Sequence, residues 1–257
     1  MPMLGHLAEN GFVAGWEFRE ESESPNSRNL QFIKSCVANM PKGRKIKYFR
    51  ADSATYQSEV FNWCEENDVN FAVGGHMDAS TRRMIQAIPA GSWMPYKYQD
   101  SKEKITEVIH SMNNTEKAFR LIWIQRPFQT EFEGMKKDEE EEMYSKRYRV
   151  IATNFPKHIS PEEVVKWYNQ RGNTSENKIK ELKNDFAMER MTSKDFGANA
   201  MYFSIGVLAY NLYVMFRTLV LGEDLRQARV LTVRWRLFNM AGRIVYHARQ
   251  IYLKVSS

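Results

Sequence analysis

Residues 167–184 read WYNQRGNTSENKIKELKN, and the interpretation of the whole chain starts from this stretch. Gly172 followed by Asn173 interrupts its helical periodicity at a place where a left-handed residue can end a helix. The stretch therefore predicts a helix-turn-helix, with the second helix beginning near residue 174 or 175. Its polar side chains of interest are Tyr168, Arg171, Glu176 and Lys183.

A capping box marks the start of the first helix. Ser160 suits the N-cap, Pro161 takes the first helical position, and Glu163 follows where a capping box requires an acid. Val164 and Tyr168 then recur at helical spacing. We expect a helix that begins at residue 161 and buries this apolar side.

The second helix carries an apolar stripe beside a charged one, because each helical residue turns by about 100°. The apolar stripe consists of Ile179, Leu182 and Phe186. The charged stripe consists of Glu176, Lys180 and Lys183. Glu176 thus borders the buried face. On the pattern alone, the favoured interpretation is a solvated ion pair between Glu176 and Lys180.

The polar residues of this stretch resemble a known motif. Their order, Tyr168, Arg171, Glu176 and Lys183, is similar to the YREK signature of cut-and-paste insertion-sequence transposases of the DDE type. The words YNQRG and ENKIKELKNDF resemble that family more specifically, and YFRADS at residues 48–53 resembles the strand end that carries its second catalytic Asp. The chain departs from the signature in one place, since four residues separate Arg171 from Glu176 where the family usually has three.

The resemblance implies metal-dependent cleavage and joining of DNA. In the family, three carboxylates hold two Mg²⁺ ions about 4 Å apart, and water or a 3′-hydroxyl attacks a phosphodiester. Asp52 and Glu176 correspond to the second and third carboxylates, so they are the expected catalytic and metal-binding residues. The expected contacts to phosphate and to the element's ends are Tyr168, Arg171 and Lys183.

The elements ahead of this stretch predict an α/β fold. We expect strands at residues 3–8, 12–19, 46–51 and 69–73, with helices at 30–40 and 56–64. This order is that of a ribonuclease-H-like mixed sheet that is incomplete at its N-terminal end. Asp52 lies where the third strand ends. On position alone it is an ordinary helix cap, and the resemblance makes it a metal ligand.

The chain divides into three expected segments. Residues 1–76 form the N-terminal part of the ribonuclease-H-like domain, residues 77–156 a β-rich insertion, and residues 157–257 the C-terminal helical part with a basic tail. Within the insertion, residues 131–142 are rich in acids and predict an exposed loop with no assigned role.

Composition favours a globular intracellular protein with a nucleic-acid partner. The chain has 257 residues, of which 43% are hydrophobic, enough to bury a core. Its net charge of +6 fits DNA binding. Cys36 and Cys64 lack the spacing of a zinc site or disulfide framework, so a reducing cytosol is expected. No secretory signal and no nucleotide-binding glycine motif is recognisable.

The last part of the chain concentrates positive charge. Residues 225–257 hold seven Lys and Arg residues and no acid. We expect Arg234 and Arg236 to contact DNA phosphates while the interleaved apolar residues pack partly on the domain. A basic solvated helix is the open alternative.

Residues 196–216 contain no charged residue and are long enough to cross a bilayer. They also contain the polar residues Asn199, Ser204 and Asn211, and no second such segment exists. A buried core helix is the favoured interpretation, and no membrane partner is expected.

The first catalytic Asp of the family has no match here, so the resemblance is to a C-terminal portion of a transposase that begins at an internal Met. We expect an insertion-sequence DNA transposase that forms a homo-oligomer in synapsis, with this portion inactive alone. Whether the chain is itself an enzyme stays open. The alternative is a non-catalytic DNA-binding remnant or regulator of the intact transposase, and a membrane protein built on residues 196–216 is a distant third.

Overall fold

The structure is a computed structural model that describes residues 2–96, 102–127, 144, 146–239, 241–247 and 249–255. The acid-rich run at 131–142 lies outside these residues. The chain forms two compact units, one of Glu21–Gly172 and one that combines Met1–Glu20 with Asn173–Ser257. Each unit is described by itself.

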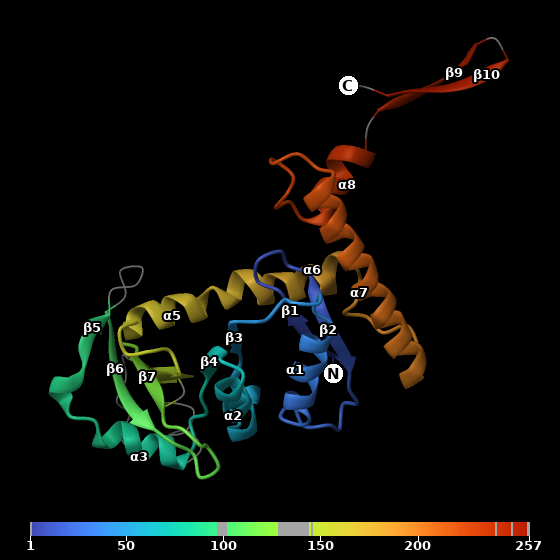
Figure 1. Cartoon of the computed structure of the whole chain (residues 1–257). Coiled ribbons are helices and arrows are strands. Elements are labelled where there is room, and N and C mark those ends of the chain that lie inside the picture. The colour runs from blue at the N-terminus through green and yellow to red at the C-terminus, as the bar shows by residue number, and fades with distance from the viewer. Residues whose placement is uncertain are drawn as a thin grey trace, which may run out of the picture. The chain divides into compact units, whose positions relative to one another are not determined.

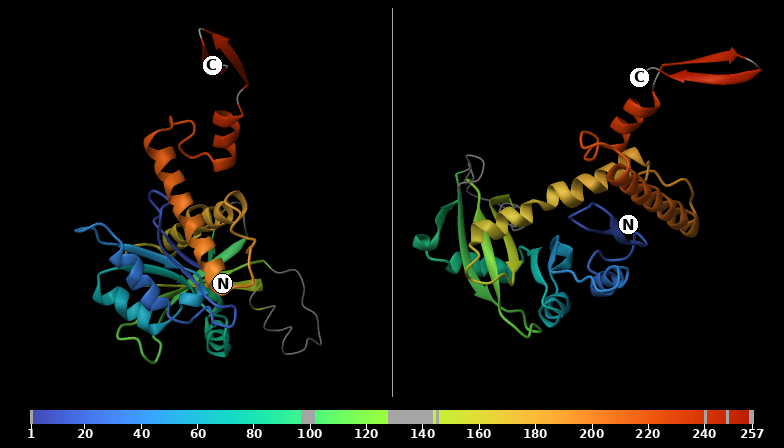
Figure 2. Two further views of the ribbon diagram at one scale, coloured as in Figure 1. Left: turned by 90° about the vertical axis from the view of Figure 1, so that its right-hand side faces the viewer. Right: turned by 45° about the horizontal axis from the view of Figure 1, so that its top comes forward.

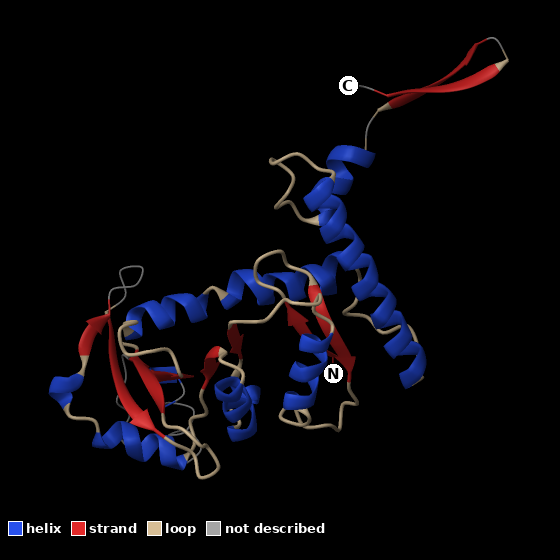
Figure 3. Ribbon diagram, in the orientation of Figure 1, coloured by secondary structure: helices blue, strands red, loops and turns tan. Residues whose placement is uncertain are grey.

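The unit Glu21–Gly172 is built on a six-stranded sheet with the strand order β3-β4-β8-β7-β6-β5 (Figures 1 and 3). Its strands are β3 (Tyr48–Ala51), β4 (Asn70–Gly74), β5 (Met94–Tyr96), β6 (Glu103–His110), β7 (Phe119–Gln125) and β8 (Tyr148–Thr153). β3 and β4 run parallel and every other neighbouring pair runs antiparallel. The expected α/β class with a mixed sheet is therefore confirmed.

Helices cover both faces of this sheet (Figure 1). One face packs against α1 (Asn29–Ala38), α2 (Ser58–Glu66) and α3 (Ala79–Ala87), and the other against α5 (Pro161–Asn169). Alternate residues of β4 serve the two faces: Phe71 stacks on Phe61 of α2 with ring centroids 4.3 Å apart, whereas Ala72 packs with the residues of α5. The sheet is therefore buried on both sides.

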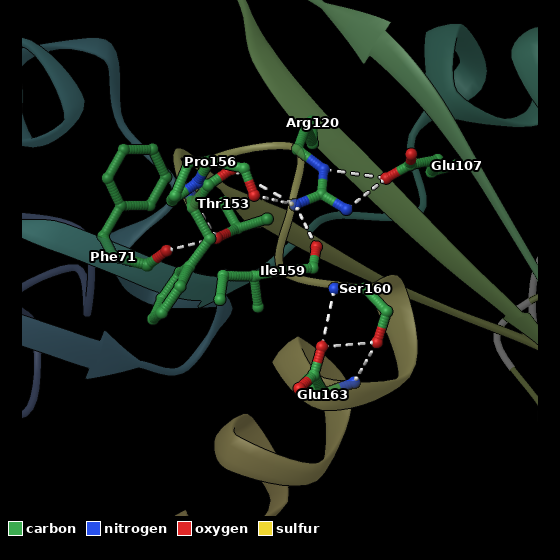
Figure 4. Close-up of polar contacts among 9 residues, drawn as sticks. Phe71, Glu107, Arg120, Thr153, Pro156, Ile159, Ser160 and Glu163 are labelled. Atoms are coloured by element: carbon green, nitrogen blue, oxygen red, sulfur yellow. Dashed lines mark hydrogen bonds and ion pairs between the residues drawn. The ribbon is translucent and has the colours of Figure 1, made fainter.

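Strands from residues 77–156 continue this sheet. β8 pairs antiparallel with β4, and Thr153 donates a hydrogen bond from Oγ1 to the carbonyl of Phe71 at 2.6 Å (Figure 4). The segment expected as a β-rich insertion thus shares one sheet with β3 and β4. The proposed boundaries at residues 76 and 156 stay a prediction.

A buried arginine fixes the loop that leads into α5 (Figure 4). Arg120 on β7 is only 4% exposed and forms an ion pair with Glu107 on β6 at 2.6 Å. One of its nitrogens, Nη1, donates to the carbonyls of Phe155, Pro156 and Ile159 at 2.9–3.2 Å. Because buried charges must be compensated, this network holds the start of α5 against the sheet.

The predicted capping box at that start is confirmed. Ser160 Oγ accepts the backbone N–H of Glu163 at 3.2 Å, and the Glu163 carboxylate accepts the N–H of Ser160 at 2.8 Å. The hydrogen bonds to Ser160 lower the pKa of Glu163.

The expected helix-turn-helix is wrong. Gly172 does not take a left-handed conformation; among the described glycines only Gly11 and Gly43 have positive φ. Instead, α5 is followed by a π-helical turn, Gly172–Glu176, and then by α6 (Asn177–Asp185). A π-turn accommodates one extra residue in a helical backbone, and it falls where the sequence has one residue more than the signature.

The second unit packs a hairpin on helices. β1 (Pro2–His6) pairs antiparallel with β2 (Val13–Phe18), as expected from the turn at Asn10-Gly11, but the pair forms its own two-stranded sheet. Asn211 of α7 (Phe196–Leu219) ties the hairpin down, since it accepts the N–H of Val13 at 2.9 Å and donates to its carbonyl at 3.0 Å. Hairpin and helix thereby share one core with Leu182 and Phe203.

Residues 196–216 lie in a helix, as expected, but only one side of it is buried, whereas a buried core helix was predicted. Figures 1 and 2 show α7 as one uninterrupted helix. None of the described helices is both long and apolar enough to cross a membrane.

The C-terminal end differs from the expected helical end. After α8 (Val230–Phe238), the chain forms a hairpin of β9 (Gly242–His247) and β10 (Gln250–Val255). Its apolar residues Ile244, Tyr246, Ile251 and Leu253 are exposed, so they do not pack on the domain as the sequence suggested. Both segments are rich in β-branched and aromatic residues, which favour strands, and the interpretation as a basic helix overlooked this signal.

Candidate functional site

Asp52 lies directly after β3 and caps the short helix η1 (Ser53–Thr55). Its Oδ1 accepts the N–H of Ala54 at 3.2 Å, and the residue is exposed. The interpretation of Asp52 as a helix cap is therefore compatible with its interpretation as a metal ligand. The backbone is held by the strand and the cap while the carboxylate faces solvent.

Tyr168 of α5 reaches the same end of the sheet. A Cβ placed on Gly74, the last residue of β4, would lie 2.9 Å from Tyr168 Oη and 3.2 Å from the backbone N of Ser53. The carbonyl carbon of Asp52 would lie 3.6 Å away. The phenol of Tyr168 thus occupies space that is open only because residue 74 is a glycine. This space lies beside Asp52 and Ser53, the two residues that follow β3. Nothing in the sequence indicated that Gly74 has this role.

Arginines accompany these residues. The Arg171 guanidinium lies 5.8 Å from the ring centroid of Tyr168. Arg50 of β3 lies 4.8 Å from the ring centroid of Trp167 and donates to the Trp167 carbonyl at 2.6 Å. Since alternate strand residues share a side, Tyr48 and Arg50 project to one side of β3, and Asp52 follows the strand directly. Asp52, Tyr168 and Arg171, predicted from distant parts of the sequence, thus belong to one compact unit.

An aromatic group missed by the sequence analysis adjoins them. Tyr48 at the start of β3 is 56% exposed and stacks on Phe155 with ring centroids 5.9 Å apart. Trp167 lies 5.9 Å from Tyr48 as well. The available signal was the alternation of Tyr48 and Arg50 along the predicted strand, which places both on one side just ahead of Asp52.

Glu176 and Lys183 belong to the other unit. Glu176 ends the π-turn, and both side chains are exposed. Leu182 is fully buried, as the apolar stripe of this helix predicted, while Ile179 and Phe186 are partly buried. The structure does not place the two units relative to each other, so the pairing of Glu176 with Asp52 stays a prediction.

A buried charge network anchors α6, and the sequence did not indicate it. Glu181 and Arg217 of α7 are each 3% exposed and lie 3.9 Å apart, and Lys178 lies 3.6 Å from Glu181. The N–H of Val230 donates to Glu181 at 3.3 Å. Burial, and then the charge of Arg217, lowers the pKa of Lys178.

Basic residues of the C-terminal part are partly paired. Arg229 forms an ion pair with Asp185, and Arg236 lies 3.4 Å from Asp224. Arg234 and Arg236 are both exposed on α8. The two predicted phosphate contacts therefore face solvent.

The carboxylate of Asp52 suits a hard divalent cation, because its oxygens are the donor type that Mg²⁺ prefers and it is exposed. Within the described part of the chain, no group of three or more His, Cys, Asp or Glu side chains is arranged to hold a metal.

Comparison with known proteins identifies the family. No curated protein matches the chain. A family described as "Transposase DDE domain group 1" matches residues 10–257, which is nearly the whole sequence. The mixed α/β sheet agrees with the ribonuclease-H-like fold expected from the resemblance. The chain therefore belongs to the DDE transposases of group 1.

Proposed function

We propose that the transposase to which this chain belongs carries out metal-dependent cleavage and strand transfer at the ends of an insertion sequence, and that Asp52 and Glu176 are two of its catalytic carboxylates. The observation that carries the proposal is the position of Asp52, an exposed carboxylate held at the end of β3 beside Tyr168. Family membership supports DNA as the substrate and a divalent metal ion in the chemistry.

Asp52 and Glu176 would hold Mg²⁺ through their oxygens. When bound, the metal supplies a stronger nucleophile and stabilises the leaving oxygen of the phosphodiester. The protein's own contribution is to fix the Asp52 carboxylate. The strand limits the backbone of Asp52, and the hydrogen bond from the Ala54 N–H limits its side chain.

Tyr168, Arg171 and Lys183 would contact the element's end. Tyr168 is only 9% exposed, with its Oη beside Gly74 and its ring 5.8 Å from the guanidinium of Arg171, so its part would be to position Arg171 for the DNA backbone. Arg234 and Arg236 would add phosphate contacts that do not depend on sequence. Synapsis of two ends would bring copies of the chain together as a homo-oligomer.

The test is strand cleavage of DNA that carries the element's ends, with Mg²⁺ or Mn²⁺, by the transposase and its Asp52→Asn variant. Removing a metal ligand should abolish metal-dependent cleavage while leaving DNA binding intact. Asp78→Asn is the matched control, because Asp78 caps α3 by accepting the N–H of Thr81 at 2.7 Å, and Asn also caps helices well. Equal cleavage by the Asp52 and Asp78 variants would contradict the catalytic role.

The alternative function is a DNA-binding regulator without catalysis. The exposed arginines of α8 favour it, since they need no metal to bind phosphate. Tight DNA binding with no cleavage by the parent protein in either metal would support this alternative over the first proposal.

A further inference from the structure

α7 exposes an apolar stripe on the side opposite its core. The stripe consists of Met201, Ile205, Leu208, Leu212, Met215 and Leu219. Their exposed fractions lie between 43% and 75%. Contiguous apolar surface of this kind is uncommon on a monomeric protein and usually marks an interaction site.

The stripe is not needed for packing inside its own unit. The buried side of α7 uses a different set of residues, Phe203, Val207, Tyr210 and Val214, which pack against the hairpin and α6. Substitutions on the exposed stripe therefore leave this core in place.

The spacing of the stripe identifies its partner as an α-helix. Its six residues follow one another at intervals of 4, 3, 4, 3 and 4 residues. This is the a and d pattern of a coiled coil, in which knobs of one helix enter holes of another with the same repeat. The stripe runs along about 27 Å of helix, which is enough for several layers of such packing.

The residues that flank the stripe favour a second copy of the same helix. In coiled coils, charged flanking residues select a partner of opposite charge. Here the flanking positions are uncharged: Tyr202, Ser204, Ala209, Asn211, Phe216 and Thr218. No like charges along this face would repel a second copy of the same helix. No charges on it would attract a helix with charged flanking residues.

The intervals between the stripe residues, 4, 3, 4, 3 and 4, are the same in either direction along the helix. The stripe residues of two antiparallel copies can therefore lie opposite one another. A two-fold axis between Leu208 and Leu212 would place Leu208 opposite Leu212 of the partner subunit. Met201 would then face the partner's Leu219, and Ile205 the partner's Met215. Antiparallel packing also brings opposite ends of the helix dipoles together.

We infer that two copies of this chain associate through α7, as an antiparallel pair joined along the stripe Met201–Leu219. The inference extends the oligomer of the proposed function but rests on other residues. Its test contains no DNA, so its failure would leave the roles of Asp52 and Glu176 untouched.

The experiment is sedimentation of the full chain over micromolar concentrations. The parent protein should reach a dimer. A Leu208→Glu/Leu212→Glu variant should be a monomer, because the pairing would bury four carboxylates at the centre of the interface. The matched control, Met94→Glu/Ile109→Glu, places the same charges on exposed apolar positions of the other unit and should remain dimeric. Circular dichroism checks that the variants keep the parent's helix content.

Cysteine cross-linking gives a second readout that needs no unfavourable substitution. A Leu208→Cys/Leu212→Cys variant should form disulfide-linked dimers under mild oxidation, and Met94→Cys/Ile109→Cys should not exceed the parent, which already contains Cys36 and Cys64. A parent protein that stays monomeric and a stripe variant that does not cross-link would overturn the inference. So would a folded Leu208→Glu/Leu212→Glu variant that is still a dimer.

Discussion

The hydroxyl of Tyr168 lies over Gly74, at a point where the Cβ of any larger residue would be 2.9 Å away. Tyr168 comes from α5 and Gly74 from the end of β4, so this contact sets how closely the helix approaches the sheet beside Asp52. Because the phenol ring is itself packed in the core between α5 and the sheet, it has little room to retreat.

Gly74→Ala should therefore displace Tyr168 and lower the free energy of unfolding by about 1–3 kcal/mol, as overpacking usually does. Urea unfolding measures the change. Tyr168→Phe removes the clashing oxygen, so the double variant should recover much of the loss, which a double-mutant cycle detects. Gly91→Ala is the control, since a Cβ there meets nothing within 4 Å. Equal stability of the Gly74 and Gly91 variants would show that the contact does not constrain the helix.

Glu181 gives a second prediction. Glu181→Gln leaves the guanidinium of Arg217 buried without its carboxylate, and breaking a buried pair in this way typically costs about 3–5 kcal/mol. We expect a large fall in the midpoint of urea unfolding. Glu223→Gln, which removes a carboxylate that is 92% exposed and 4.0 Å from Arg226, should change stability little. If both variants unfold at the parent's midpoint, the Glu181 network does not anchor α6.

Local signals in the sequence predicted local structure well. The capping box at Ser160 and the hairpin turn at Gly11, whose φ is +80°, each depend on a few adjacent residues. The residue types at these positions limit the backbone conformations that are available, so the local structure can be predicted. The strand end at Asp52 was recognised for the same reason. Resemblance then supplied the chemistry that position alone left ambiguous.

Long-range relationships were not predictable. Glu181 stands in a lysine-rich stretch with Lys178, Lys180 and Lys183 and therefore looks solvated, but its burial depends on Arg217 of α7. The pairing of β4 with β8 joins segments far apart in the chain. Gly172 shows the limit of a local rule: glycine often ends a helix, but here the helical backbone continues through a π-turn. The exposed stripe of α7 was hidden because an uncharged helix looks equally apolar on every side.

His6 predicts a pH dependence of stability. Burial, and then the charge of Lys178, lowers the pKa of His6 to about 4 in the folded protein. The unfolded chain, with a His pKa near 6.5, binds more protons at intermediate pH, so acid favours unfolding. The contribution of neutral His6 is complete above about pH 6.5 and is lost as the pH falls toward 4.

Chemical unfolding between pH 7 and pH 4 checks this expectation. His6→Gln should flatten the decline in the free energy of unfolding that the parent shows over this range, whereas His247→Gln, at an exposed position, should not. Identical slopes for the parent and the His6 variant would mean that other groups govern the acid sensitivity.

Arg171 and Lys183 predict how DNA binding responds to salt. Each phosphate contact releases counterions. The slope of log K against log salt, which is negative, therefore becomes less steep by about 0.9 for each contact that is lost. Arg171→Ala/Lys183→Ala should weaken binding to the element's end and flatten the slope by roughly 2. Lys117→Ala is a suitable control, because Lys117 is already engaged by Glu65 at 3.1 Å, and it should leave the slope unchanged. Fluorescence anisotropy with labelled end DNA over a salt series measures both quantities. If the double variant binds as tightly as the parent at every salt concentration, Arg171 and Lys183 do not contact the DNA. Arg234 and Arg236, whose side chains are exposed on α8, would then be the remaining predicted contacts to phosphate.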